Sequence, residues 1–363
     1  MIGLALSGGG SRAIAFHLGC LRALHDRGVL SRVNVISAVS GGSIIAAMYG
    51  YSSDPFEDFD QKVRGLLKRG LQRPMALRLM SPRLLPRVLA TNLVSQPVAG
   101  ISQLLRVQPP LRRWASRTDS LEAVVAGIVG AQELNQVQRP NFDIVFNACE
   151  LRTGTAFRFS NKCSGSWRTG EIRGNKITVA HAVACSAAYP VVLPAFDRRY
   201  VFTKNGTETK RRVIIADGGV YDNLGITCLE PGRDKRFSLH NYPADYLICC
   251  SAGQGQLSGE SIPYGFYTRV SSAYRSTFRK VQDAAFDRLH TYQRDGRIKG
   301  FILPYLGQQD PALPIRPPDL VPRNDVMDYP TNFAAMSEDS VNKLTKRGEQ
   351  LTRLLLEYYC PEL

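Results

Sequence analysis

Near the start of the chain, short continuous apolar runs alternate with a segment of helical apolar spacing. Residues 2–6 and 33–36 are short apolar runs, each suited to one buried strand. Between them, residues 13–27 show a helical pattern that ends at Gly28, a typical helix stop. This order predicts a strand–helix–strand unit in which the two strands are parallel neighbours. In open α/β sheets, ligands bind at the carboxyl ends of such strands.

Further strand and helix patterns follow, without an internal repeat. In chain order they predict a hairpin over 141–160, a helix of small residues within 177–194 that stops before Pro190, buried strands at 213–216 and 246–250, an amphipathic helix over 270–292, a Pro-rich loop over 310–330 and a closing helix over 337–359. The aromatic side chains of the 270–292 helix are expected to lie in the core. Gly348 indicates close packing of the closing helix, because glycine inside a helix costs about 1 kcal/mol against alanine.

A Gly-rich turn, Gly8-Gly9-Gly10, directly follows the first apolar run. Together with Ala13 it fits the G-x-G-x-x-A dinucleotide fingerprint, but such a site also needs an acidic residue at the end of the second strand. The second strand ends in Ser37-Ala38-Val39-Ser40, without a carboxylate. A P-loop is excluded because no Gly-Lys-Ser/Thr follows. The turn is therefore a dinucleotide site, a plain tight turn, or an oxyanion hole whose backbone N–H groups bind developing negative charge.

Ser40 lies on a second turn, between the second strand and the next helix. A serine on a sharp strand-to-helix turn, with small residues two positions before and after it, is a nucleophile elbow. Gly42 fills the second small position, and Ala38, one methyl group larger than glycine, fills the first. Ser40 is therefore the candidate nucleophile. Ser37 and Ser43 are less suited, because the first lies within the strand and the second one turn into the helix.

A third motif, Asp217-Gly218-Gly219, follows the apolar run 213–216. Asp-Gly-Gly is a common hairpin turn, and this remains one interpretation. In the other, Asp217 ends a buried strand and its neighbouring glycines leave space around the carboxylate. Such a carboxylate could reach the Ser40 hydroxyl.

The positive charge of the chain is concentrated in one segment. Lys and Arg number 46 against 31 Asp and Glu, a net charge of +15, and residues 61–118 contain no acidic residue. This segment is broken by prolines and mixes apolar with basic residues. It suits a lid or cap that rests on an anionic lipid surface, a helical insertion with solvated arginines, or, less well, a nucleic-acid surface, since Trp114 alone could stack on bases. The membrane or lid candidates are Arg64, Lys68, Arg69, Arg73, Arg78, Arg83 and Arg87.

The eight cysteines form no C-x-x-C pair, and several lie inside apolar runs. A disulfide framework or a structural zinc site is therefore not expected, and no metal or cofactor is expected either. The N-terminus lacks the basic region of a signal peptide, and no apolar run is long enough to span a membrane. We expect a cytoplasmic protein that contacts membranes only peripherally.

The order Gly-Gly-Gly-x-Arg, x-x-Ser-Gly-Gly and Asp-Gly-Gly resembles the patatin-like phospholipase family over roughly residues 1–225. The stretch Ala184–Pro190 is similar to the family's small-residue helix, while Ala38 and Ala13 depart from its glycines. The resemblance implies a three-layer α/β/α fold with a mostly parallel central sheet and a basic helical insertion as a cap. It implies one domain over 1–363, with a core of 1–60 and 119–305, the insertion 61–118 and the closing helix 337–359.

The resemblance also implies a Ser–Asp dyad without histidine. Ser40 would attack an ester carbonyl, and Asp217 would act as general base and then acid. Gly8, Gly9 and Gly10 would form the oxyanion hole. The supporting residues would be Arg12, Gly41, Gly42, Gly218 and Gly219.

Three functions follow as hypotheses. The first is a lipid acyl hydrolase that cuts phospholipid or other acyl esters at an anionic membrane surface. The second is a nucleotide-binding oxidoreductase built on the first turn, and the third is a non-catalytic effector that binds membranes. A regulatory ligand or partner protein stays open.

Overall fold

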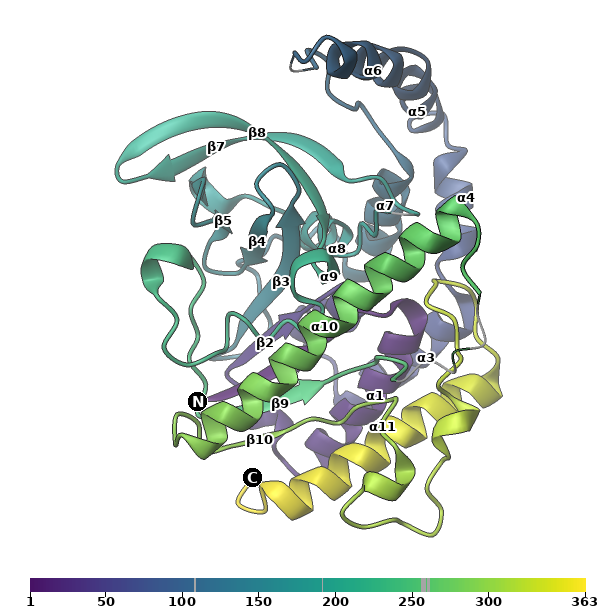
Figure 1. The fold of residues 1–363 in the computed structure, drawn as a ribbon, viewed down its shortest axis with the longest axis vertical. Coiled ribbons are helices and arrows are strands. Elements are labelled where there is room, and N and C mark those ends of the chain that lie inside the picture. The colour runs from purple at the N-terminus through teal and green to yellow at the C-terminus, as the bar shows by residue number, and fades with distance from the viewer. Residues whose placement is uncertain (108, 191, 256–258, 260–261) are drawn as a thin grey trace.

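The computed structural model describes residues 1–107, 109–190, 192–255, 259 and 262–363, with only the backbone at 267, 271 and 274. In this part of the chain the strands form one ten-stranded sheet (Figure 1). Five neighbouring strands are parallel, in the order β10-β9-β1-β2-β3. They are β1 (Ile2–Leu6), β2 (Val35–Ala38), β3 (Asp143–Glu150), β9 (Tyr246–Cys250) and β10 (Gly300–Ile302). The α/β fold with a mostly parallel central sheet is thus confirmed.

An antiparallel extension continues from β3 and curls back to it. Its strands are β4 (Thr155–Ser160), β5 (Ser164–Ser166), β6 (Gly170–Ile172), β7 (Phe196–Lys204) and β8 (Thr207–Asp217). The end of β8 rejoins β3, where Asp217 pairs with Ala148. On the same strand, Phe146 pairs with Ala38, the last residue of β2. The register therefore places Asp217 just beyond the carboxyl end of β2.

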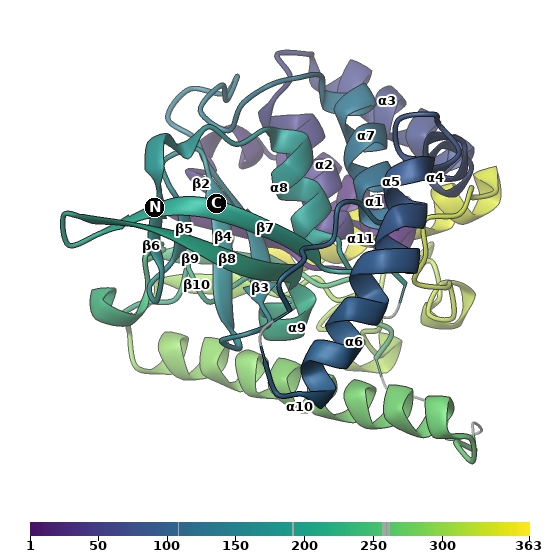
Figure 2. The same cartoon turned by 90° about the horizontal axis from the view of Figure 1, so that it is seen from above.

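Helices cover both faces of the sheet, which gives three layers (Figure 2). One face carries α1 (Gly10–Asp26), α2 (Gly41–Gly50), α3 (Phe56–Arg69), α7 (Arg117–Val129), α8 (Val179–Ser186) and α11 (Glu338–Tyr359). The other carries α9 (Gly219–Asp222) and α10 (Phe266–Arg294). The hairpin, the small-residue helix and the closing helix are all present as predicted.

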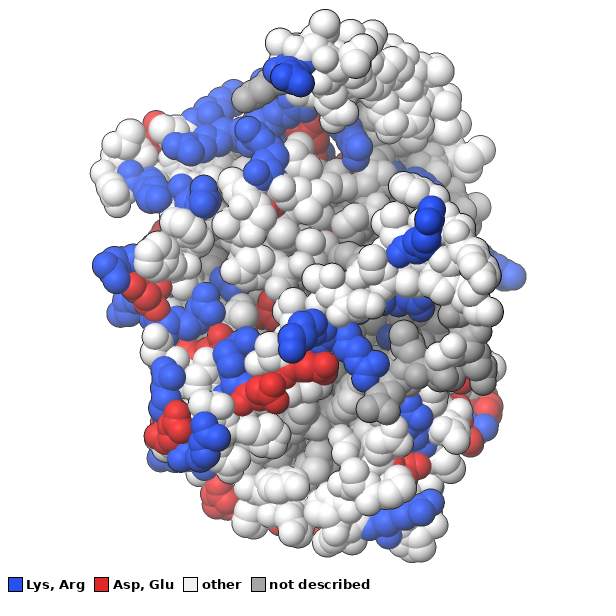
Figure 3. Space-filling view, in the orientation of Figure 1, with Lys and Arg blue, Asp and Glu red and all other residues white. Residues whose placement is uncertain are grey.

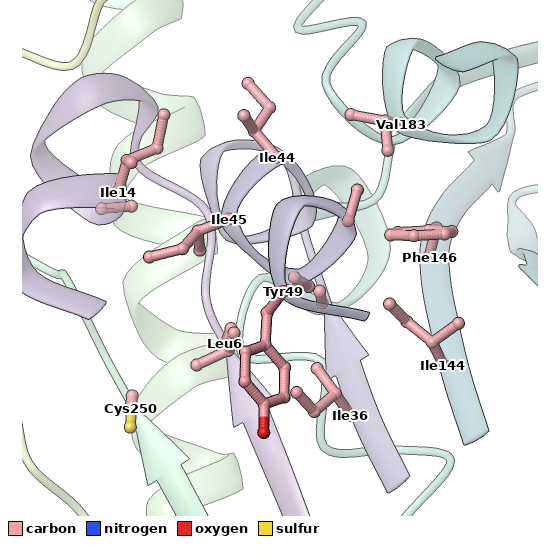
Figure 4. Close-up of a cluster of buried hydrophobic side chains, with 14 of the residues drawn as sticks. Leu6, Ile14, Ile36, Ile44, Ile45, Tyr49, Ile144, Phe146, Val183 and Cys250 are labelled. Atoms are coloured by element: carbon pink, nitrogen blue, oxygen red, sulfur yellow. The ribbon is translucent and has the colours of Figure 1, made fainter. Parts of the chain in front are cut away.

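The larger core lies between the sheet and the first helical layer (Figure 4). Leu6, Ile36 and Ile144 of three parallel strands meet Ile45 of α2 there. Within this layer α11 packs directly on α1. A Cβ added at Gly348 would collide with the carbonyl oxygen of Phe16, so the predicted close packing is confirmed.

Helix α10 corrects one expectation. Ala285 and Leu289 are buried, but Val270 and Val281 are half exposed and Phe278 lines a cavity. The side chain of Tyr274 lies outside the described part. The aromatic spacing of this helix therefore does not mark a core position throughout, because one side of the helix faces the cavity.

The basic segment 61–118 divides into two parts. Its first residues belong to α3, which packs on the body; there Arg64 and Lys68 approach Glu338 of α11, with N–O distances of 3.8 and 2.7 Å. These two residues are thus paired with the closing helix at the surface, and their membrane contact stays a prediction. The remainder forms α4 (Gln72–Leu79), α5 (Leu85–Ala90), a π-helical turn (Thr91–Ser95) and α6 (Gln96–Leu104).

Residues 85–104, here called the tip, project from the body at the top of Figure 1. Figure 3 shows their surface nearly free of charged side chains on this face. The exposed apolar residues of the tip are Leu89, Leu93, Val94, Ile101 and Leu104. The basic residues Arg69, Arg73, Arg78, Arg83 and Arg87 are exposed on the tip or on the chain leading to it. Among the described helices, none is both long and apolar enough to cross a bilayer.

Candidate active site

Ser40 sits in a strained turn between β2 and α2. Its backbone has φ 51° and ψ −117°, a region that residues other than glycine rarely adopt. The Ser40 N–H donates to the Ser186 hydroxyl at 3.0 Å, which holds the turn against α8. A Cβ at Gly41 would collide with the Gly10 carbonyl oxygen, and one at Gly42 with the Leu6 carbonyl oxygen. Both glycines are therefore required by the close approach of the two Gly-rich turns.

Asp217 lies beside Ser40 and is 3% exposed. Its carboxylate accepts a hydrogen bond from the Gly219 N–H at 2.6 Å. Burial raises the pKa of Asp217 to about 7, although this hydrogen bond and the nearby Ser40 hydroxyl oppose the rise. Gly218 has no room for a side chain, because a Cβ there would collide with the Asn147 carbonyl oxygen.

The Gly-rich turn between β1 and α1 borders the same site. Gly9 has φ 148° and Gly10 φ 61°, conformations that favour glycine. Within the described residues, the N–H groups of Gly9, Gly10 and Gly41 have no hydrogen-bond acceptor. The Gly8 N–H, by contrast, already donates to the Asn223 carbonyl at 3.1 Å. The structure thus leaves Gly9 and Gly10 available as donors and adds Gly41, which sequence reasoning had treated only as a supporting residue.

Arg12 is buried and bonds to backbone carbonyls. Its Nε donates to Ala252 at 3.0 Å and its Nη1 to Tyr329 at 2.7 Å. Burial lowers the pKa of the guanidinium to about 10. The neighbouring Ser11 N–H donates to the Asn332 carbonyl at 2.7 Å. Two loops distant in sequence therefore close over the start of α1, which nothing in the local pattern of the Pro-rich loop indicated.

A cavity of about 910 Å³ begins at Ser40 and Asp217 and extends along α10. Its apolar lining includes Met75, Leu193, Phe278, Phe286 and Phe333. Its polar lining includes Arg275, Arg279, Gln282 and Asp283, all on α10. Within the described part of the chain, no histidine hydrogen-bonds Ser40 or Asp217. The arrangement offers a hydroxyl, a buried carboxyl group and free N–H donors at one end of a largely apolar cavity.

Fold and site together define an α/β protein with a serine on a sharp strand-to-helix turn beside a buried carboxyl group. The sequence model of the family described as "Patatin-like phospholipase" matches residues 4–229, which is more than half of the chain. The chain belongs to the patatin-like phospholipase family and so to the carboxylic ester hydrolases. The resemblance seen in the three motifs is confirmed.

Structures of human GIVD cytosolic phospholipase A2 show the same fold at low sequence identity. Human GIVD cytosolic phospholipase A2 aligns with a TM-score of 0.56 at 11% identity, over 98% of this chain and 61% of that one. Its complex with methyl γ-linolenyl fluorophosphonate and terbium chloride gives 0.52 at 13%, over 98% and 57%. VipD from Legionella pneumophila gives 0.42 at 15%, over 99% and 67%. This chain spans about three fifths of the human enzyme's length. A search of curated protein sequences finds no match.

Proposed function

We propose that the protein is a serine lipid acyl hydrolase of the phospholipase A or lysophospholipase type, with Ser40 as nucleophile and Asp217 as general base. One observation carries this proposal: the Ser40 side chain, on a positive-φ turn, lies beside the buried carboxyl group of Asp217 at the end of a large apolar cavity. A solvated carboxylate with a pKa of about 3.9 is a weak base. Burial raises the pKa of Asp217 to about 7, which suits proton transfer near neutral pH.

The reaction follows in two halves. Ser40 Oγ attacks the acyl carbonyl carbon while Asp217 takes the hydroxyl proton, and the carbonyl π electrons move to the oxygen. The N–H groups of Gly9, Gly10 and Gly41 stabilise this oxyanion, each by about 3 kcal/mol. The intermediate collapses, the ester C–O bond breaks, and Asp217 returns its proton to the leaving alcohol. Water then attacks the acyl-enzyme with Asp217 as base again, which releases the fatty acid and restores Ser40.

The cavity favours a lipid substrate. Its Phe, Met and Leu side chains suit an acyl chain, and its size is in the upper range for small-molecule sites. Arg275 and Arg279 have no carboxylate within 4 Å among the described residues, so they can meet an anionic headgroup. This supports phospholipid or lysophospholipid as substrate.

We further propose that the enzyme acts peripherally at an anionic membrane. The tip carries exposed leucines and Arg87, and the chain leading to it carries Arg78 and Arg83, without a compensating acid. Apolar insertion and attraction to anionic lipid together give the two contributions that stable interfacial binding needs. This surface would bring the cavity to its substrate.

The structure does not favour the oxidoreductase hypothesis, because the position of the dinucleotide pyrophosphate is occupied by another part of the chain. In dinucleotide-binding folds the pyrophosphate sits at the N-terminus of the first helix. Here the Asn332 carbonyl oxygen accepts the Ser11 N–H at that position and packs against Gly10. Family membership also favours the hydrolase.

The test is labelling with a fluorophosphonate probe, followed by mass mapping of the modified peptide. We expect the label on Ser40 in the wild type, none there in Ser40→Ala, and slower labelling in Asp217→Asn. Ser120→Ala is the matched control, since this serine is also buried, lies on α7 and does not line the cavity, so its loss should leave Ser40 reactive. An unlabelled wild type, both alone and with anionic vesicles, would refute the proposed activity and favour the non-catalytic effector.

A further inference from the structure

A cluster of metal-ligating side chains lies behind the Gly-rich turn, outside the cavity. His17 and Cys20 are three residues apart on α1 and so share one helix face. Cys250, the last residue of β9, pairs with Leu6 of β1 and points to the same side of the sheet (Figure 4). One ligand atom from each residue lies within 4.8 Å of the others, and all three residues are fully buried.

The tautomer of His17 is set by its surroundings. Its Nε2 lies 2.9 Å from the Ser7 carbonyl oxygen, which can only accept, so Nε2 carries the hydrogen. In a neutral imidazole, Nδ1 then presents a lone pair. This Nδ1 is buried and has no hydrogen-bond partner. Metal-ligating histidines are oriented in this way, with the distal N–H donated to a carbonyl or carboxylate.

We propose that His17 Nδ1, Cys20 Sγ and Cys250 Sγ bind one Zn²⁺ ion. Thiolate and imidazole are ligands that zinc prefers. Tetrahedral bonds of about 2.0–2.3 Å place ligand atoms about 3.3–3.8 Å apart, so these three atoms, which lie within 4.8 Å of one another, would move closer on binding. Binding releases the two thiol protons to solvent, so two thiolates and Zn²⁺ make a neutral site. Neutrality matters because an unbalanced charge in this core would be strongly unfavourable. A monovalent ion would leave one negative charge uncompensated.

A fourth position has a neutral oxygen nearby. The Thr352 hydroxyl of α11 hydrogen-bonds the Gly348 carbonyl at 2.8 Å and also interacts with the Cys20 thiol. The ion would thus connect α1, β9 and the closing helix. Tetrahedral sites with few or no open positions are typical of structural zinc.

The site would also support the turn that carries Gly9 and Gly10. Ser7, two residues before Gly9, donates its N–H to the Cys250 carbonyl at 3.1 Å and accepts from His17 through its own carbonyl. Zinc would hold both partners of Ser7 in place. The proposal concerns stability and rests on this geometry alone, so it stands or falls independently of the proposed hydrolase activity.

The sequence did not indicate this site. The proposed zinc ion departs from the expectation, drawn from the sequence, that the protein binds no metal. Cys20 and Cys250 are far apart in the chain, and neither belongs to a C-x-x-C pair. Only the parallel pairing of β9 with β1 brings Cys250 under α1.

The experiment measures zinc in the purified full-length chain. Reduced protein is incubated with Zn²⁺, freed of excess by gel filtration, and analysed by plasma mass spectrometry. We expect about one zinc per chain in the wild type and roughly tenfold less or lower in Cys20→Ser and Cys250→Ser. Cys249→Ser is the matched control, because Cys249 neighbours Cys250 on β9, is equally buried, and belongs to the core on the opposite face. It should retain its zinc.

Titration with Co²⁺ gives a second readout on the wild type alone, should the serine variants fail to fold. A thiolate-to-Co²⁺ charge-transfer band that Zn²⁺ abolishes would support the site. The proposal is overturned if the reduced wild type holds no zinc and shows no such band. Zinc retained by both Cys20→Ser and Cys250→Ser, or a Cys20–Cys250 disulfide in place of the metal, would overturn it as well.

Discussion

Replacing Asp217 with asparagine should make the protein more stable while it abolishes hydrolysis. The carboxyl group is 3% exposed, and burial raises its pKa from 3.8 to about 7. A difference of about 3 pKa units, at 1.36 kcal/mol each, corresponds to about 4 kcal/mol. Since the folded state binds the proton more tightly than the unfolded state, the contribution of Asp217 to native stability is highest below pH 4. It falls as pH rises and stops falling above pH 7, where Asp217 is ionised in both states.

An asparagine side chain cannot ionise, so the Asp217→Asn variant escapes this penalty and still offers an oxygen to the Gly219 N–H. We expect the variant to exceed the wild type by about 4 kcal/mol in free energy of unfolding at pH 8. At pH 5 the folded wild type is protonated, and the advantage should shrink to about 1–2 kcal/mol. Urea unfolding at the two pH values measures both numbers. The same pKa predicts that kcat/KM of the wild type rises with pH to a plateau, with a midpoint near 7.

Asp197 provides the matched control. It is also 3% exposed, but its carboxylate accepts two hydrogen bonds from Arg212, at 2.6 and 2.8 Å. Asp197→Asn removes the charge that balances this guanidinium, so it should destabilise the protein at pH 8. Equal effects of the two substitutions, a stability difference at Asp217 that does not change with pH, or an activity midpoint near pH 4 would refute the reasoning.

Three further predictions concern packing and substrate contact. Gly348→Ala should lower the free energy of unfolding by about 1–3 kcal/mol, because the new Cβ would collide with the Phe16 carbonyl oxygen. Gly65→Ala, in open space on α3, should raise the free energy of unfolding slightly. Thermal unfolding of the two variants measures both effects. Leu104→Glu on the tip should weaken binding to anionic vesicles several-fold and leave hydrolysis of a short soluble ester unchanged. Phe237→Glu, at an exposed position outside the tip, is the control and should affect neither property. Vesicle co-sedimentation measures the binding, and an ester assay measures the hydrolysis. Arg279→Gln should raise KM for an anionic phospholipid several-fold with little change for a neutral ester, and equal effects on both would count against headgroup recognition.

Local chemistry made part of this site predictable. The elbow at Ser40 and the Gly-rich turn are each encoded within a few residues, because a sharp turn, a positive φ and a close backbone approach all require glycine or another small residue nearby. Because both turns follow the carboxyl ends of neighbouring parallel strands, they lie together at the same edge of the sheet. The Asp217 motif was recognisable by its strand and its glycines.

Contacts between distant segments were not predictable in the same way. The pairing of Arg64 and Lys68 with Glu338 joins residues about 270 positions apart, so the sequence around either residue did not indicate it. Helix α10 has the apolar spacing of a core helix, yet part of that stripe faces a cavity instead of the sheet. A period of 3.6 residues shows which side of a helix is apolar, but it does not show what that side contacts.

The position of Asp217 combines both kinds of information. Its motif is local, but its distance from Ser40 depends on the antiparallel strands curling back until β8 takes up the edge of β3 that β2 leaves free. A shift of that register by one residue would turn the Asp217 side chain to the opposite face of the sheet. Gly218 permits this register, because a side chain there would collide with the Asn147 carbonyl oxygen and push β8 away from β3. The glycine after Asp217 therefore does more than leave space for a substrate: it allows the close strand approach that buries the carboxylate, and this burial produces its raised pKa.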